Sequence, residues 1–247
     1  MKRVLIFSIL LMLTYSSFAQ KKGDKSPTWF FLSGGGGFGN AMFFEKHFFE
    51  GVEVKASALN PTYGFYGKFG VMFPFNMGLV YEFSSQTLTQ SYDMVSNNPT
   101  TLSEEYTDKI VLGTTGHAIL LRAGGVETGY FEIGPKFTTN SKTPDYRGGN
   151  MYAERYTTIE LGFGGPLYYQ EAFDISLGVR LNYALTNIMQ DEHYPYAGPL
   201  YSTSAYTDLY TTNPLTLQLR LEFHWRIGYF KTAKCDGHTE FLFFGKN

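Results

Sequence analysis

Strict alternation of apolar and polar residues near the carboxyl end constrains the fold more than any other feature of this chain. In "LTLQLRLEFHWRIGYF", residues 215 to 230, every odd position is apolar. The even positions before the final residue are polar or small and include Arg220, Glu222, His224 and Arg226. A period of two indicates a β-strand whose two faces meet different surroundings. A helix cannot place such a row on one face, because its side chains repeat roughly every 3.6 residues.

The same period recurs along the chain and predicts about eight strands. The other segments are 29–38, 63–73, 77–85, 110–122, 129–138, 158–169 and 173–186. The facing of 29–38 and of 110–122 cannot be assigned, because both of their faces carry apolar residues. The last two strands of the chain, 173–186 and 215–230, are much longer than the five or six residues, roughly, of an ordinary strand.

The predicted connections alternate in length. Four are long and span roughly 38–62, 89–109, 139–155 and 187–214. The three between them are short and cover 74–76, 123–127 and 170–172. Long loops at one end and short turns at the other are typical of up-and-down barrels of the bacterial outer membrane.

The amino terminus has the pattern of a secretory signal peptide. Lys2 and Arg3 precede an apolar run over 4–15, and Ser17-Phe18-Ala19 offers small residues for cleavage. We therefore expect a signal peptide over 1–19, a periplasmic lead over 20–27, one barrel domain over 28–230 and a tail over 231–247. The lone cysteine, Cys235, excludes an internal disulfide framework, and a net charge of −2 gives no reason to expect nucleic acid as a partner.

These observations predict an all-β fold: a single eight-stranded, up-and-down, antiparallel transmembrane β-barrel with long extracellular loops and short periplasmic turns. The apolar rows would face lipid and the polar rows would line the lumen. A soluble β-sandwich is the alternative, because its strands alternate too. Aromatic residues are expected at the two membrane boundaries. These rings are Phe73, Phe75, Tyr168, Tyr169, Phe173, Trp225, Tyr229 and Phe230 at the turn side, with Tyr63, Phe65, Tyr156 and Tyr183 at the loop side.

The polar rows predict a network of charges inside the barrel. Its expected members are Lys68, Glu82, Glu132, Lys136, Glu160, Asp174, Arg180, Arg220, Glu222, His224 and Arg226. Apart from the histidine they form five bases and five acids, so we interpret them as a structural plug of paired charges. A charge-lined path for ions is the alternative. Inward glycines at 162, 164 and 178 are expected to make room for the long side chains beside them.

Motifs for catalysis are weak. His117 lies near Thr114 and Thr115, but no Gly-x-Ser-x-Gly element is present. The run 190–196, "QDEHYPY", is interpreted as a solvated loop rather than a metal site. We therefore predict no catalytic residues, no cofactor and no metal. Exposed tyrosines are common in recognition surfaces, so the fourth long loop is a candidate ligand contact. Its tyrosines are Tyr194, Tyr196, Tyr201, Tyr206 and Tyr210.

The segments "GYFEIGPKFT", "TIELGFGG", "DISLGVRLNYALTNI" and "LQLRLEFHWRIGYF" resemble the later strands of the PorT-like outer-membrane barrel family, which is similar to OmpX and OmpA. The resemblance covers roughly 28–230 and specifies architecture better than function. It implies an exported outer-membrane protein in contact with lipid, lipopolysaccharide and the barrel-insertion machinery. One member of that family belongs to a type IX secretion apparatus.

The expected function is a non-enzymatic, structural or surface barrel with loops open to a ligand or partner. Three alternatives stay open: an accessory part of a protein export machine, a lipid A-modifying enzyme, and a small channel. The export role would add a partner from that machine.

Overall fold

The structure is a computed structural model and describes residues 28–44, 54–96, 104–125, 127–142, 152–170, 172–188 and 212–227. Within these ranges every regular element is a β-strand. The strands are β1 (Trp29–Phe44), β2 (Val54–Ala56), β3 (Pro61–Met72), β4 (Met77–Ser96), β5 (Glu104–Gly125), β6 (Gly129–Lys142), β7 (Arg155–Tyr169), β8 (Phe173–Ala184) and β9 (Asn213–Ile227).

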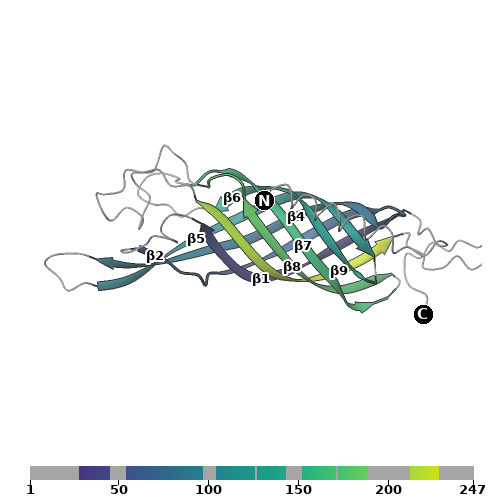
Figure 1. Ribbon diagram of the computed structural model, residues 1–247, viewed down its shortest axis with the longest axis horizontal. Helices are drawn as coiled ribbons and strands as arrows, with labels where there is room; N and C mark the ends of the chain where they lie inside the picture. The colour runs from purple at the N-terminus through teal and green to yellow at the C-terminus, as the bar shows by residue number, and fades with distance from the viewer. Residues whose placement is uncertain are drawn as a thin grey trace, which may run out of the picture.

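Eight of these strands form one closed ring (Figure 1). Each pairs antiparallel with the next along the chain, and β1 pairs with β9 to close the sheet. The short β2 stands outside the ring and pairs only with β4. The predicted eight-stranded, up-and-down, antiparallel barrel is therefore confirmed. Closure matters because a sheet closed on itself leaves no row of unpaired backbone groups along its edges.

The connection predicted as a long loop over 89–109 is wrong in most of its length. β4 and β5 continue as a paired ribbon from Thr89↔Val111 to Ser96↔Glu104, so only 97–103 is left between them. This ribbon extends past the other strands, and β2 lies along it (Figure 1). Alternation fails there because neighbouring segments cover polar side chains on the ribbon. The Gln90 amide, for example, accepts from the Phe43 N–H and donates to the Ser57 carbonyl.

The three short connections join the strand pairs that the alternation predicts, although β5 continues to Gly125, past the predicted start of the second connection at 123. At the first, the Phe73 N–H donates to the Met77 carbonyl at 2.7 Å, and Asn76 adopts a left-handed conformation with φ of 57°. Asparagine tolerates this region better than most residues. At the second, Gly124 has φ of 133°, where a side chain would be strained. Tight turns therefore fix the register of the strands that they join.

The barrel reverses the burial pattern of a soluble protein. On β9, Leu217, Leu219 and Phe223 point outward and are 50%, 54% and 53% exposed. The alternate residues Arg220 and Glu222 point inward and are buried. The apolar row of the opening sequence motif therefore forms the outer wall, and its polar row lines the interior.

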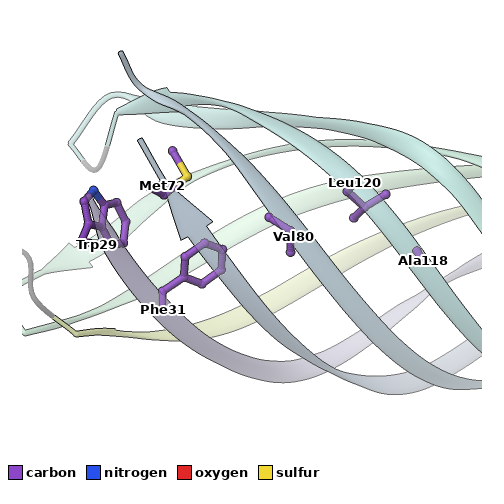
Figure 2. Close-up of a cluster of buried hydrophobic side chains, with 6 residues drawn as sticks. All are labelled: Trp29, Phe31, Met72, Val80, Ala118 and Leu120. Atoms are coloured by element: carbon purple, nitrogen blue, oxygen red, sulfur yellow. The ribbon is translucent and has the colours of Figure 1, made fainter. Parts of the chain in front are cut away.

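The interior is apolar towards its turn end. Figure 2 shows a cluster at that end made of Trp29, Phe31, Met72, Val80, Ala118 and Leu120. This cluster explains why the facing of 29–38 and 110–122 was not predictable: both strands also carry outward apolar residues, such as Phe30 and Ile119. Apolar side chains fill both sides of the wall there, so polarity does not distinguish the two faces.

Two aromatic residues that were predicted at the membrane boundaries are not exposed on the outer wall. Tyr156 is buried at 5% exposure, on the inward row that it shares with Thr158. Tyr169 is half-buried, with the Arg226 guanidinium carbon 4.7 Å from its ring centroid. By contrast Phe75, Tyr168 and Trp225 are exposed at the turn end. Tyr229 and Phe230 lie outside the described residues.

The described residues contain no helix long and apolar enough to cross a membrane. The predicted signal peptide, the periplasmic lead up to residue 27, the tail and Cys235 all lie outside the described residues, so those domain boundaries remain predictions.

Candidate functional site

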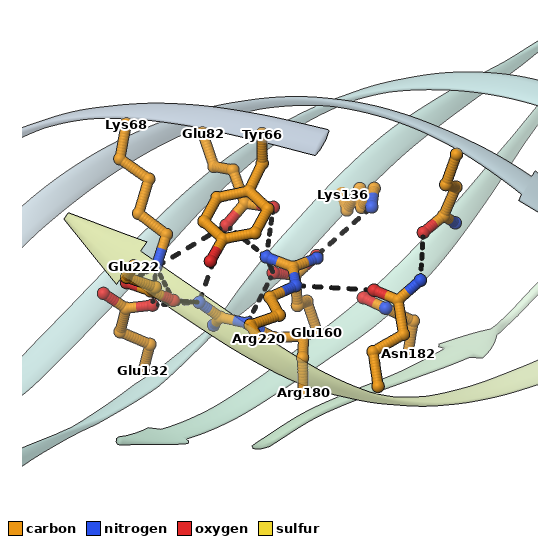
Figure 3. A network of polar contacts seen from close by, with 12 residues as sticks. Tyr66, Lys68, Glu82, Glu132, Lys136, Glu160, Arg180, Asn182, Arg220 and Glu222 are labelled. Atoms are coloured by element: carbon orange, nitrogen blue, oxygen red, sulfur yellow. Dashed lines mark hydrogen bonds and ion pairs between the residues drawn. The ribbon is translucent and has the colours of Figure 1, made fainter. Parts of the chain in front are cut away.

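Charged side chains inside the described barrel form a connected network of ion pairs and hydrogen bonds. All eleven residues expected there point inward and are buried, with exposures between 0% and 5%. They come from β3, β4, β6, β7, β8 and β9, so the network reaches across the lumen rather than along one wall (Figure 3).

Glu132 on β6 accepts hydrogen bonds from more cations than any other acid of the described network. Its carboxylate accepts from Lys68 Nζ at 3.0 Å and from Arg180 Nη2 at 2.5 Å. A third cation, Arg122, donates to its other oxygen at 3.1 Å. Three positive side chains from three strands therefore converge on one buried carboxylate.

Glu222 on β9 connects the closing strand to the first half of the chain. Lys68 Nζ donates to both of its oxygens at 2.9 Å. His224 Nε2 lies 3.0 Å from the same carboxylate, with its ring edge-on to Phe31 and Tyr130. The histidine thus sits between the ionic centre and the apolar end of the lumen.

Glu82 and Glu160 complete the centre. Arg220 Nη1 donates to both oxygens of Glu82 at 2.9 Å. Glu160 lies 3.2 Å from Arg180 Nε and 3.5 Å from Lys136 Nζ. Because all four glutamates have at least one cation within 3.5 Å, no carboxylate in this centre is left uncompensated.

A second, separate ion pair lies nearer the turn end. Arg226 pairs with Asp174, and Ser176 Oγ donates to the same aspartate at 2.6 Å. The guanidinium also donates to the Gln170 carbonyl at 2.6 Å. This pair ties β9 and β8 to the third short turn.

Three inward residues were missing from the predicted network. Arg122 is the only charged residue in 110–122, and that lone charge on an apolar strand was the available signal. Counting it, the described lumen has six lysines and arginines against five acids, so the predicted balance of five and five is wrong. Tyr66 donates to the Leu221 carbonyl at 3.0 Å and lies under the Arg220 guanidinium at 4.3 Å. The guanidinium carbon of Arg122 lies 3.8 Å from the centroid of the Tyr130 ring.

Glycines on the inward rows provide the space for these large side chains. A Cβ at Gly162 would lie 2.1 Å from Arg180 Nη1, as expected. A Cβ at Gly164 would lie 2.5 Å from Tyr130, so this glycine accommodates a tyrosine ring rather than the predicted arginine or glutamate. A Cβ at Gly178 would also lie near the Tyr130 hydroxyl, at 3.1 Å.

The packed network leaves little room for a solute. Two voids beside it have volumes of ≈ 20 Å³ and ≈ 10 Å³. Each is about large enough for one water molecule. Lys136 and Asn182 line the smaller void, and the Lys136 ammonium makes no hydrogen bond within the described residues.

The candidate catalytic residues are on opposite faces of β5. Thr114 is buried and donates to the Gln86 carbonyl at 3.3 Å. His117 points outward, and its Nδ1 lies 2.6 Å from the Tyr81 hydroxyl. Thr115 shares the outward face with His117.

Within the described ranges no cluster of three or more His, Cys, Asp or Glu could hold a metal ion. The run 190–196 and the tyrosines Tyr194, Tyr196, Tyr201, Tyr206 and Tyr210 lie outside those ranges.

Comparison with known proteins gives little sequence support. No protein-family model matches the chain, and no curated protein matches it. Among solved structures the chain is similar to the outer membrane protein OprG from Pseudomonas aeruginosa, with 17% identity and a TM-score of 0.46. The match covers 83% of this chain and 97% of that one.

Proposed function

We propose that this chain is a non-enzymatic β-barrel of the outer membrane, with a structural or surface role and a lumen closed by its own ion pairs. The observation that carries the proposal is the inverted burial: leucines and phenylalanines cover the outer wall, while lysines, arginines and glutamates fill the interior. Soluble monomers rarely expose a continuous apolar surface larger than several hundred Å². In a membrane the same surface contacts hydrocarbon, and a closed barrel satisfies every backbone group.

The packing of the interior supports a closed barrel over a channel. The long side chains of Arg180 and Arg220 lie across the lumen and are 1% exposed. Their removal from water is compensated by Glu132 on β6 and Glu82 on β4. A conducting pore of this strand number would need these side chains to swing aside, because eight strands enclose a space only wide enough for side chains.

Fractionation of cells that express the full chain tests the membrane location. We expect the protein in the outer-membrane fraction, extractable only with detergent and with a gel mobility that changes on heating. Recovery in a soluble fraction without detergent would contradict the proposal. Purified protein in a planar lipid bilayer then tests closure: we expect no steady conductance, and reproducible open steps at low voltage would favour the channel alternative.

The finer role rests on the predicted loops and on the resemblance to PorT-like barrels. Comparing proteins in the medium, on the surface and in the periplasm, with and without this gene, separates the roles. Cargo that accumulates in the periplasm would favour the export accessory. Unchanged cargo would favour the surface role. A loss of lipid A modification on His117→Ala would favour the enzyme.

A further inference from the structure

One stretch of the outer wall, on β4, β5 and β6, is polar at a height where the outward rows of β8 and β9 are apolar. Tyr81 on β4 and His117 on β5 both point outward and are exposed, and a hydrogen bond of 2.6 Å joins the Tyr81 hydroxyl to His117 Nδ1. The second ring nitrogen of His117 has no hydrogen-bond partner among the described residues. Phe83 and Phe137, the cross-strand neighbours of His117, flank the pair.

The polar stretch continues in the next row of the sheet. Ser85, Thr115 and Thr139 are direct cross-strand partners on β4, β5 and β6. All three point outward and are partly exposed. We call these five residues, Tyr81, His117, Ser85, Thr115 and Thr139, the polar strip.

The polar strip lies well inside the height of the apolar belt. His117 is six residues along β5 from Ala123, which pairs with Met77 beside the first turn. With about 3.3 Å per residue and a tilt of about 40°, this places His117 roughly 15 Å above the turn end. The outward apolar band of such barrels is about 25 Å tall. His117 therefore lies beyond the reach of the water at the turn end.

The opposite wall shows that this polarity is not general. The outward row of β9 is apolar from Leu215 to Ile227, and that of β8 is apolar from Phe173 to Tyr183. On β9 the residue at a matching distance from the turn end is Leu219, six positions from Trp225. One wall therefore suits lipid throughout its height, and the other does not.

We propose that the polar strip is the interface at which a second copy of this chain docks, side by side in the membrane. Hydrocarbon tails offer no hydrogen bond to the free His117 nitrogen or to the hydroxyls of Ser85 and Thr115. A neighbouring membrane protein does, and polar side chains are common in contacts between membrane-spanning segments.

Three properties of the polar strip fit a second copy. Copies inserted in the same direction bring the same residues to the same depth, so His117 meets its own counterpart across a twofold axis. Each hydroxyl both donates and accepts a hydrogen bond, and the imidazole offers its second ring nitrogen, so the strip is complementary to itself. It carries no lysine, arginine or carboxylate, so two copies meet without repulsion between like charges.

Oxidative cross-linking of single-cysteine variants tests the interface. The inference rests on the proposed membrane location, so it is tested on full-length protein purified from the membrane fraction and placed in lipid vesicles. In a Cys235→Ser background, Thr115→Cys marks the strip and Leu219→Cys marks the opposite wall. We expect a disulfide-linked dimer from the first variant and at least about fivefold less from the second.

Adding His117→Phe to the Thr115→Cys variant supplies the matched control. It keeps an aromatic ring of similar size and removes the hydrogen bonds, so we expect cross-linking to fall by about fivefold while heat-modifiable gel mobility stays unchanged. Equal cross-linking from both walls, or a monomer by sedimentation in every variant, would overturn the interface. Protein that never reaches the membrane fraction would instead contradict the proposed function.

Discussion

The middle and the turn end of the lumen are filled by opposite chemistry. At the turn end Trp29, Phe31 and Met72 pack as an ordinary apolar core. In the middle, Lys68, Arg180 and their glutamates are equally buried but charged. Apolar packing tolerates exchanges that preserve volume, whereas a buried ion network loses stability sharply when one member is removed. Substitutions in the two regions should therefore lower the stability of the barrel in different ways.

Removing the acid that accepts hydrogen bonds from three cations should have the largest effect. Glu132→Leu leaves the cations of Lys68, Arg122 and Arg180 without their shared partner. We expect a loss of about 3–5 kcal/mol in the free energy of unfolding, measured by urea titration in detergent micelles. Lys68→Met added to Glu132→Leu should cost less than the sum of the two single changes. Additive losses would show that the network is not coupled.

A cavity in the apolar end should cost somewhat less. Leu120 is 0% exposed inside the cluster, so Leu120→Ala is expected to lose about 2–4 kcal/mol in the same titration. The matched change Leu120→Met preserves volume and should lose less than about 1.5 kcal/mol. If the two variants lose equally, the turn end is not packed as described.

Overpacking beside the network should have an intermediate effect. A Cβ at Gly164 would lie 2.5 Å from the Tyr130 ring, so Gly164→Ala is expected to cost about 1–3 kcal/mol. Tyr130→Leu frees the space, and the double variant should lose little beyond Tyr130→Leu alone. A full additional loss in the double variant would mean that the ring is not what Gly164 accommodates.

An exposed ion pair provides the smallest effect. Glu154 and Arg155 lie 3.9 Å apart with side chains that are 73% and 78% exposed. Arg155→Gln should change the unfolding free energy by less than about 0.5 kcal/mol, because water and salt screen the pair. A loss as large as that of Glu132→Leu would contradict the view that burial decides the cost of a broken pair.

The sequence predicted strands that line the charged part of the lumen better than strands that line its apolar end. β9 was predictable as a strand and in its facing because its two rows differ in polarity from Leu215 to Ile227. β5 was predictable only as a strand, because Ile119 and Leu121 face outward while Ala118 and Leu120 face inward. For that reason Arg122 was not predicted to point inward, and the sixth cation of the lumen was missing from the predicted network.

Pairings were less predictable than facing. Alternation places Glu132 and Arg180 inside, but only the register of the sheet brings them together across the lumen. The ribbon of β4 and β5 was missed because polar residues on it, such as Gln90, are covered by the end of β1 and by the segment that follows β2. Burial of this kind depends on the tertiary structure, so it produces no alternation of apolar and polar residues in the sequence.

The pairing of β1 with β9 has a consequence for the order of assembly. The contacts between Lys68 and Glu222 join residues 154 positions apart, and β9, the last strand of the described residues, provides one side of the seam. Until that strand is in place the sheet has two open edges, and its charges remain hydrated. Closing the ring, pairing the interior charges and completing the outer wall are thus a single late event that requires β9.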